Sequence, residues 1–206
     1  MTSHPKDLSD ELIDVIKNGK HICHAIHLPV QSGSTRVLDK MNRKYTREHY
    51  LNIVRKIKEN IKDVELTTDI IVGFPGETEE DFNDTMSLIK EVKYQQIFGF
   101  LYSKRKGTAA EKFDGHLPLK TKKERLAKLI EEEREIASEI SRGYIGKQVR
   151  VLIEGTNKLF LVGTTEQNKN INITLPKDKK VEDYMGKFVD AVVTSSKLTV
   201  LYGKLI

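Results

Sequence analysis

The sequence predicts an α/β unit followed by a small antiparallel β-barrel of five strands. Over the first 143 residues, strand-like apolar runs alternate with amphipathic helical runs, an order that favours parallel strands joined by helical crossovers. From Gly146 onward the hydrophobic period changes to two, and short strand-like runs separated by turns follow, as in small barrels. We therefore expect two domains, residues 1–143 and 144–206.

The first unit is expected to contain three strands, at residues 24–30, 66–72 and 96–102. The second of these is nearly continuous in β-forming residues, which favours burial on both faces. Helices are expected at residues 8–16, 34–41, 46–61, 78–92 and 121–142. Ser34 and Thr46 are candidate N-caps, and residues 78–81 have the form of a capping box. In the second unit, strands are expected at residues 149–153, 160–162, 171–173, 189–193 and 198–202, with the last turn at 195–197.

Composition limits the class of protein. The chain is 38% hydrophobic and 32% charged, and its longest apolar stretches are only strand-sized, which predicts a globular protein without a membrane span. The amino terminus lacks the features of a secretory signal, so a cytoplasmic location is the expectation. The single cysteine, Cys23, excludes an internal disulfide and an all-thiolate metal site. We expect it to be a small buried residue before the first strand.

Basic residues are concentrated in the second unit. Residues 144–206 carry ten Lys or Arg against six Asp or Glu, whereas the preceding 143 residues carry 25 against 24. A basic terminal module suits a polyanionic partner, although a surplus of this size also suits an ordinary solvated surface. The candidate RNA-binding residues are Lys147, Arg150, Lys158, Lys177, Lys179 and Lys180. Further cations are Lys169 and Lys197, and the candidate stacking rings, of which we expect about one to contact a base, are Tyr144, Phe160, Tyr184 and Tyr202.

Polar residues follow or interrupt two of the predicted strands, where parallel sheets bind ligands. Gln31 offers an amide beside the flexible run Ser–Gly–Ser, although a turn into a capped helix explains the same residues. Asp69 lies inside an apolar strand, where a carboxylate needs a ligand or a structural partner. Loop 73–77 has glycines that admit a flat ring against the backbone, but an ordinary strand-to-helix turn also uses them. Arg43 stands near the end of a helix, where a cation also suits the dipole.

Five runs occur in order along the chain: SHPKD (3–7), HLPVQSGS (27–34), MNRKYT (41–46), TTDIIVGFPGETEEDF (67–82) and YSKRKGT (102–108). Together they resemble the tRNA methylthiotransferases, whose core is a radical S-adenosylmethionine domain. The resemblance covers essentially the whole chain. It implies that residues 1–143 are the carboxyl-terminal half of a radical SAM (β/α) partial TIM barrel with a long terminal helix. Residues 144–206 resemble the family's TRAM module, an OB-like RNA-binding barrel.

The resemblance also implies a function. The runs look most like the enzyme type that adds a methylthio group to C2 of isopentenyladenosine beside the tRNA anticodon. Relatives acting on threonylcarbamoyladenosine or on a ribosomal protein fit less well. One S-adenosyl-L-methionine would give the radical that abstracts hydrogen from the adenine, and another would donate the methyl group. The implied cofactor-binding residues are Gln31, Arg43, Asp69, Gly73, Phe74, Tyr102 and Ser103. In this assignment Arg43 pairs with the methionyl carboxylate, and Asp69 or Gln31 binds ribose hydroxyls or the amino group.

The chain departs from this family in its cysteines. The family implies two [4Fe–4S] clusters in the full-length enzyme, and one cysteine cannot hold either, so we expect none to be ligated by this chain. We therefore expect a carboxyl-terminal fragment that is inactive alone. We expect the full-length enzyme to be a monomer, whereas open strand edges favour self-association of the fragment. The implied partner is the tRNA anticodon stem-loop; the alternative function is a non-catalytic RNA-binding or partner-docking fragment.

Overall fold

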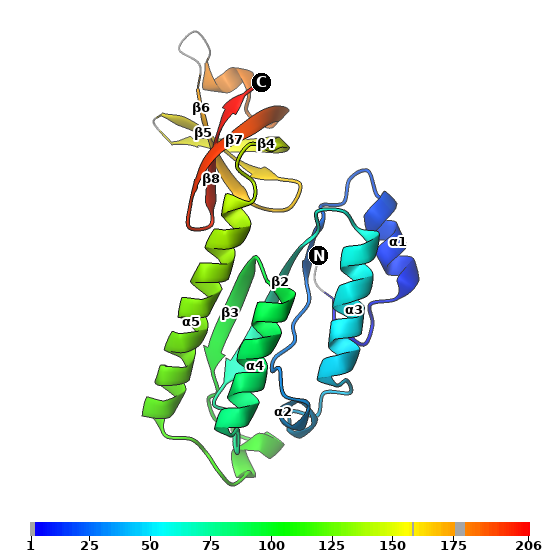
Figure 1. Cartoon of the computed structure of the whole chain (residues 1–206), viewed down its shortest axis with the longest axis vertical. Coiled ribbons are helices and arrows are strands. Elements are labelled where there is room, and N and C mark those ends of the chain that lie inside the picture. Colours follow the sequence, from blue (N-terminus) through cyan, green and yellow to red (C-terminus); the bar gives the residue numbers. More distant parts are fainter. Residues whose placement is uncertain (1–2, 158, 176–179) are drawn as a thin grey trace.

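The structure is a computed structural model that describes residues 3–157, 159–175 and 180–206. Its first unit is a parallel three-stranded sheet in the order β1-β2-β3, formed by β1 (Ala25–His27), β2 (Glu65–Val72) and β3 (Gln96–Leu101). The helices of this unit are α1 (Asp10–Asn18), α2 (Thr35–Lys40), α3 (Arg47–Asn60), α4 (Glu79–Val92), the 3-10 turn η1 (Ala109–Lys112) and α5 (Leu119–Arg142). Helix α5 leads from this unit into the barrel (Figure 1). In the described part of the chain, no helix has the length and apolarity that a membrane span requires.

Helices cover one face of the sheet and leave the other open. Along β2, every second residue is buried, and these residues share a core with apolar side chains from α3, α4 and α5. The alternate residues of β2, which include Asp69 and Ile71, are only partly buried. The expectation that this strand is covered on both faces is therefore wrong for the described residues. Its continuous β-forming sequence reflects Thr and Ile on the open face, which suit a strand whether it is covered or not.

Three predicted helix starts are confirmed by their capping bonds, whereas α1 begins at Asp10 instead of residue 8 and α5 begins at Leu119 instead of residue 121. The Ser34 hydroxyl accepts from the Val37 N–H at 3.3 Å, and the Thr46 hydroxyl accepts from the His49 N–H at 3.2 Å. Thr78 opens α4 with the complete capping box that the sequence predicts. Strand β1 is shorter than predicted because Pro29, which has no N–H to donate, interrupts the run.

The second unit is a closed five-stranded barrel, as predicted. Its strands are β4 (Gln148–Asn157), β5 (Phe160–Thr165), β6 (Asn170–Thr174), β7 (Phe188–Lys197) and β8 (Val200–Leu205), with a short 3-10 turn η2 (Val181–Asp183) before β7. Four of the five pairings are antiparallel, but β6 and β8 run parallel. The last turn falls at residues 198–199 instead of 195–197. Leu198 turns the chain there with a φ of 53°.

The barrel sits against the amino ends of the sheet strands. The Tyr144 hydroxyl donates to the carboxylate of Glu65, the first residue of β2, at 2.9 Å. The Gln95 amide, just before β3, donates to the Asn168 carbonyl at 3.2 Å. Lys169 is 1% exposed, with its ammonium 3.4 Å from the Ser141 hydroxyl. Lys169 and Tyr144 are therefore buried between the barrel and the sheet. The prediction that they are among the cations and rings that face RNA is wrong.

Burial between the sheet and the barrel shifts the pKa values of two residues. Burial raises the pKa of Glu65, whereas the ammonium of Lys169 and the hydrogen bond from Tyr144 lower it in part. Burial likewise lowers the pKa of Lys169, against the attraction of Glu65. Cys23, expected to be buried, is exposed in the loop that precedes β1.

Candidate functional site

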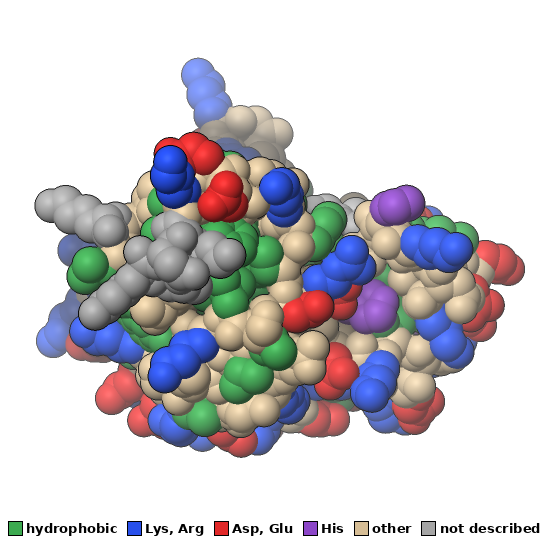
Figure 2. All heavy atoms as spheres, turned by 90° about the horizontal axis from the view of Figure 1, so that it is seen from above, with side chains coloured by type: hydrophobic (Ala, Val, Ile, Leu, Met, Phe, Trp, Pro, Cys, Tyr) green, Lys and Arg blue, Asp and Glu red, His purple; other side chains and the backbone are tan. Residues whose placement is uncertain are grey.

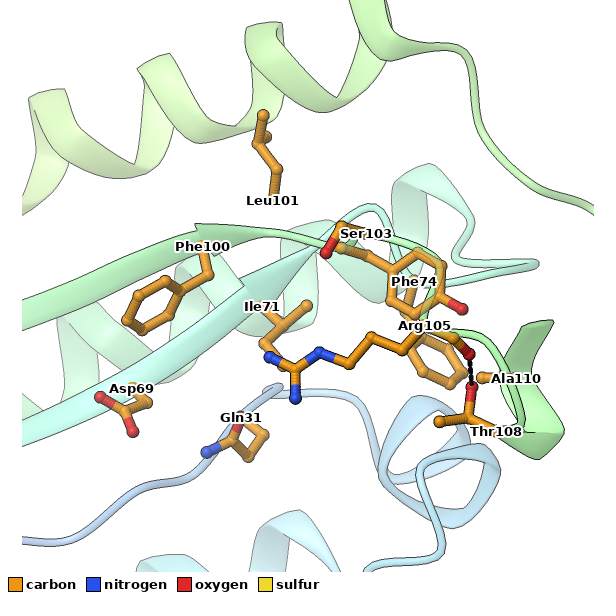
Figure 3. Close-up of a pocket in the computed structure, with 11 residues that line it drawn as sticks. Gln31, Asp69, Ile71, Phe74, Phe100, Leu101, Ser103, Arg105, Thr108 and Ala110 are labelled. Carbon is orange, nitrogen blue, oxygen red and sulfur yellow. Dashed lines mark hydrogen bonds between the residues drawn. The ribbon is translucent and has the colours of Figure 1, made fainter.

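The barrel contacts the amino ends of the sheet strands. At the other end of the sheet, a pocket of about 460 Å³ opens at the carboxyl ends of β2 and β3, and Figure 3 shows its lining residues. This is the edge at which ligands bind in parallel α/β sheets. Its lining residues are Gln31, Asp69, Ile71, Phe74, Phe100, Leu101, Tyr102, Ser103, Arg105, Thr108 and Ala110. Five of the seven predicted cofactor-binding residues, namely Gln31, Asp69, Phe74, Tyr102 and Ser103, are thus brought together in one pocket.

Gln31 is held in an unusual backbone conformation. Its φ is 70°, and the side chain is mostly buried at 8% exposure. The left-handed region costs a non-glycine residue about 1 kcal/mol. Two backbone bonds fix it, because Gln31 donates to the Asp69 carbonyl and accepts from the Ile71 N–H, both at 2.9 Å. This bridge extends the parallel pairing beyond β1 and places the Gln31 amide on the pocket side of β2 (Figure 3).

Asp69 lies on the open face of β2 with its carboxylate partly exposed. The Nε2 atom of His27 is 3.6 Å from its Oδ1 atom, and the Nδ1 atom of His27 is 2.9 Å from the Thr67 hydroxyl. The imidazole therefore orients the carboxylate without covering it. A carboxylate and a carboxamide side by side accept and donate hydrogen bonds as hydroxyl and amino groups require. Residue-based reasoning missed His27, although it is the first residue of the run HLPVQSGS.

The opposite wall of the pocket is aromatic. The rings of Phe74 and Tyr102 meet edge to face with centroids 5.1 Å apart, and His116 stacks behind Tyr102 at 5.9 Å. The ammonium of Lys122 donates to the Tyr102 carbonyl at 3.0 Å and lies 5.0 Å from its ring. These contacts fix two apolar rings at an interplanar angle of 70°, and a planar heterocycle in the pocket can pack against either of them. The Tyr102 hydroxyl is buried without a hydrogen-bond partner among the described residues.

A buried ion pair supports the loop between β2 and α4. Gly73 has a φ of 74°, and a Cβ atom there would meet the Lys122 side chain at 2.4 Å, so the position requires glycine. The Gly73 N–H donates to the Glu77 carboxylate at 3.1 Å, and Arg125 binds the same carboxylate at 2.5 Å. Gly73 does not line the pocket itself; it belongs to the loop that carries the lining residue Phe74.

Arg105 is a lining residue that the sequence prediction did not include. It follows β3 within the run YSKRKGT, and its side chain extends across the pocket toward Ile71 (Figure 3). No hydrogen bond or ion pair engages its guanidinium in the part of the chain that the structure describes. The two basic residues on either side of it, Lys104 and Lys106, carry the same charge, so the sequence offers no signal for which of the three turns inward.

Arg43, unlike five of the other predicted cofactor-binding residues, does not line the pocket. Its Nη1 atom lies 3.3 Å from the Nε2 atom of His4. The imidazole of His4 in turn packs on the ring of Tyr45, with centroids 5.6 Å apart. The assignment of Arg43 to the cofactor's carboxylate stays a prediction.

The predicted RNA-binding residues that the structure describes lie on the surface of the barrel in different environments. The ammonium of Lys147 is 5.1 Å from the ring of Tyr144, and the guanidinium of Arg150 is 4.5 Å from the ring of Phe188 and 4.0 Å from Glu166. Lys180 is exposed beside η2. The other three predicted RNA-binding residues, Lys158, Lys177 and Lys179, lie outside the described residues. Seen from the barrel end, cationic side chains are interspersed with acidic ones (Figure 2).

Among residues 3–157, 159–175 and 180–206, no group of three or more His, Cys, Asp or Glu side chains is arranged to hold a metal ion. The donor set of these residues, with Cys23 as its single thiol, therefore does not fit an iron–sulfur cluster.

Two family models and two curated relatives match this chain. A model of the Radical SAM superfamily matches residues 1–89, and a model of the TRAM domain matches residues 142–206. The chain is 47% identical over 208 residues to the tRNA-2-methylthio-N(6)-dimethylallyladenosine synthase of Acetivibrio thermocellus, covering 100% of this chain and 42% of that protein. The protein of the same name from Clostridium tetani is 50% identical over 199 residues, covering 95% of this chain and 43% of that protein.

A solved structure supports the fold of the first unit. The chain is similar to coproporphyrinogen III oxidase (HemN) from Escherichia coli, a radical SAM enzyme, with a TM-score of 0.54 and 18% identity over 66% of this chain and 32% of that one. At that identity the likeness concerns the fold alone. The chain spans 42–43% of the two curated relatives above, so their full length includes regions without a counterpart here.

Proposed function

We propose that this chain is part of a member of the tRNA methylthiotransferase family and that it supplies two parts of a tRNA-2-methylthio-N6-dimethylallyladenosine synthase. The first part is an S-adenosyl-L-methionine pocket, and the second is an RNA-binding barrel. The observation that carries the proposal is the convergence of Asp69, Gln31 and an aromatic wall in one pocket at the carboxyl end of the sheet. The proposed substrate is dimethylallyladenosine in a tRNA anticodon stem-loop, and a cytoplasmic location is proposed with it.

The residues present suit S-adenosyl-L-methionine. The carboxylate of Asp69 accepts from hydroxyl or amino groups, and the Gln31 amide both donates and accepts. The rings of Phe74 and Tyr102 supply apolar contacts for the adenine, and Ser103 also lines the pocket. Arg105, which faces the pocket, suits a carboxylate, the role otherwise assigned to Arg43. When bound, this cofactor supplies a radical precursor and a methyl group; the residues named here bind and orient it.

The cofactor proposal is tested by calorimetric titration of the purified chain with S-adenosyl-L-methionine. We expect measurable binding that Asp69→Asn weakens about tenfold, since a charged acceptor is replaced by a neutral amide. Asp14→Asn is the control, because Asp14 lies exposed on α1. Absence of binding, or equal binding by both variants, would contradict the cofactor assignment. Binding of tRNA without binding of the cofactor would favour the alternative of a non-catalytic RNA-binding fragment.

The RNA proposal is tested through ionic strength. Binding driven by phosphate contacts weakens steeply as salt rises. We expect the affinity for an anticodon stem-loop to fall by at least tenfold between about 50 and 200 mM salt, and each of Lys147→Ala, Arg150→Ala and Lys180→Ala to lower the salt slope by about one. Lys128→Ala, on the exposed side of α5, is the control. An affinity that does not change with salt would contradict this part of the proposal.

The complete reaction is proposed only for the longer protein. The residues described here do not fit a cluster, so we expect the purified chain to show neither iron–sulfur absorbance nor methylthiolation of tRNA after anaerobic reconstitution. Absorbance with turnover would contradict that expectation. The open edges of β1 and β3 favour self-association of the chain, whereas a monomer is proposed for the full-length enzyme. Sedimentation of both forms tests this difference.

A further inference from the structure

Two exposed phenylalanines on β3 are not used by the cofactor assignment. Phe98 is 41% exposed and Phe100 is 51% exposed, whereas Ile97 is buried against the helices. Successive side chains of a strand point to opposite faces, so both rings stand on the open face of the sheet. Neighbouring apolar rings in solvent are unfavourable, and a patch of this kind marks a binding surface.

The register of the sheet places these rings next to the pocket. Phe98 pairs with Asp69, and Phe100 pairs with Ile71, so all four side chains share the open face. Phe100 also lines the pocket, where its ring stands clear of the aromatic wall (Figure 3). The ring of Phe98 meets His27 edge to face at 5.8 Å. The two phenylalanines thus form an apolar strip that begins in the pocket and runs along β3 toward the barrel.

The surroundings of the strip restrict what it can bind. Asp69 and His27 border it on the side of β2 and β1, so a ligand on the strip meets polar groups along one side. The other large hydrophobic side chains exposed in the described part of the chain lie on helices, the barrel or loops away from the sheet. The strip is therefore the apolar surface continuous with the proposed cofactor pocket. A molecule that reacts beside the cofactor and carries a hydrocarbon group would place that group here.

We infer that Phe98 and Phe100 bind the dimethylallyl group of the target adenosine and so determine specificity for the prenylated base. The inference rests on the proposed function. A dimethylallyl group is a branched hydrocarbon without hydrogen-bonding atoms, so it can be distinguished from an unmodified amino group by apolar contact alone. Its burial against two rings is favourable in proportion to the area removed from water. Asp69 and His27 remain available to the polar part of the nucleoside or to the cofactor.

The inference is tested by titrating the 206-residue chain with N6-dimethylallyladenosine and with adenosine. S-adenosyl-L-methionine is kept at saturation so that neither nucleoside occupies its pocket. We expect the prenylated nucleoside to bind about tenfold more tightly. The double variant Phe98→Ala/Phe100→Ala should reduce this preference to within about twofold, and each single alanine variant should reduce it about threefold. The double leucine variant, which keeps apolar area, should retain most of it.

Leu198→Ala is the matched control, because it removes an exposed apolar side chain from the barrel instead of the sheet. Equal binding of the two nucleosides by the unmodified chain overturns the inference, and so does a preference that survives in the alanine variants. A preference for the prenylated nucleoside could also be found only in the full-length protein and be unaffected there by the alanine variants. That result would show that another part of the full-length protein covers the strip, and it would overturn the inference. Failure to bind S-adenosyl-L-methionine counts against the proposed function, whereas binding without nucleoside preference counts against this inference alone.

Discussion

At the level of single residues, the conformation of Gln31 and the chemistry of its side chain can be separated. Its φ of 70° is a conformation that glycine adopts freely. We expect Gln31→Gly to change the free energy of unfolding by less than about 1 kcal/mol, because relief of strain offsets lost contacts. The affinity for S-adenosyl-L-methionine should nevertheless fall at least about fivefold, since the amide is gone. Urea unfolding and calorimetry measure the two effects.

The control for this variant is Asn42→Gly, at another non-glycine position with positive φ, 58°. It should leave cofactor affinity unchanged, since Asn42 does not line the pocket. A Gln31→Gly chain that binds the cofactor normally would remove Gln31 from the site.

A second residue-scale prediction concerns the ion pair behind the pocket. Arg125 and Glu77 are both buried, and removal of one partner leaves an uncompensated charge. We expect Arg125→Met to lower the free energy of unfolding by about 3–5 kcal/mol at neutral pH. Arg142→Met, near the exposed end of the same helix, should cost less than about 1 kcal/mol.

The pH dependence of this variant follows from Glu77. Burial raises the pKa of Glu77, although the Gly73 N–H and Arg125 lower it in part. Without Arg125 the folded-state pKa rises further above the unfolded value. Such a group favours the folded state more as pH falls. The loss of unfolding free energy caused by Arg125→Met should therefore be smaller at about pH 5 than at about pH 8. A loss of unfolding free energy that grows on acidification would contradict the raised pKa of Glu77.

Residue identities in the pocket were predictable where a motif carried them. The resemblance selected Gln31, Asp69, Phe74, Tyr102 and Ser103, and the structure places all five around one pocket. Residue chemistry alone left a turn as an alternative explanation for Gln31 and an ion pair as one for Asp69. It gave no indication of Arg105, because the direction of a loop side chain depends on contacts that are distant in sequence. The prediction that Lys169 faces RNA was wrong for the same reason, since the burial of Lys169 depends on α5 and Glu65.

At the level of elements, Asp81 joins the starts of α2 and α4. Its carboxylate accepts from the Ser34 hydroxyl at 2.6 Å, from the Thr78 N–H at 2.7 Å and from the Arg36 guanidinium. Burial alone would raise the pKa of Asp81, but the hydrogen bonds from Arg36, Ser34 and Thr78 lower it well below its ordinary value. We expect Asp81→Asn to lower the free energy of unfolding by about 3 kcal/mol at neutral pH, measured by urea unfolding.

Because the folded-state pKa of Asp81 lies below the unfolded one, its stabilisation is present above about pH 4 and is lost as pH falls below that value. The difference between the unmodified chain and Asp81→Asn should therefore shrink on acidification. Asp84→Asn, exposed one turn later on α4, should change stability by less than about 0.5 kcal/mol at any pH. A difference independent of pH would contradict the role of the ionised carboxylate.

The elements themselves were largely predictable, because hydrophobic period and capping residues are local signals. The N-caps Ser34, Thr46 and Thr78 were identified correctly from sequence alone. The errors concern pairing between segments far apart in the chain. The parallel contact of β6 with β8, the turn at 198–199 and the open face of β2 all depend on which strand lies next to which. A local pattern is the same for a strand covered on one face or on two.

At the level of the whole molecule, the pocket and the barrel lie at opposite ends of the sheet. The pocket is at the carboxyl ends of the strands, whereas Glu65 and Gln95 meet the barrel at the amino ends. The eight residues of β2 separate the two by about 25 Å. An RNA that contacts both must extend along the molecule, past the open face that carries Phe98.

This geometry predicts that RNA length decides affinity. From the proposed function, we expect an isolated anticodon loop to reach the pocket but not the barrel, and a loop with its stem to reach both. We expect the stem-loop to bind at least about tenfold more tightly than the loop alone at low salt, since added phosphate contacts are linked to the same binding event. Fluorescence anisotropy with labelled RNAs of both lengths measures this.

The barrel variants identify the source of that difference. Combined alanine substitution of Lys147, Arg150 and Lys180 should reduce stem-loop binding to the level of the loop and leave loop binding unchanged, because the loop does not reach these side chains. The Asp69→Asn variant is the complementary control, since it alters the pocket without touching the barrel. Loop binding that falls as much as stem-loop binding in the triple variant would mean that the RNA enters from the barrel end alone, and that the two sites are not used together.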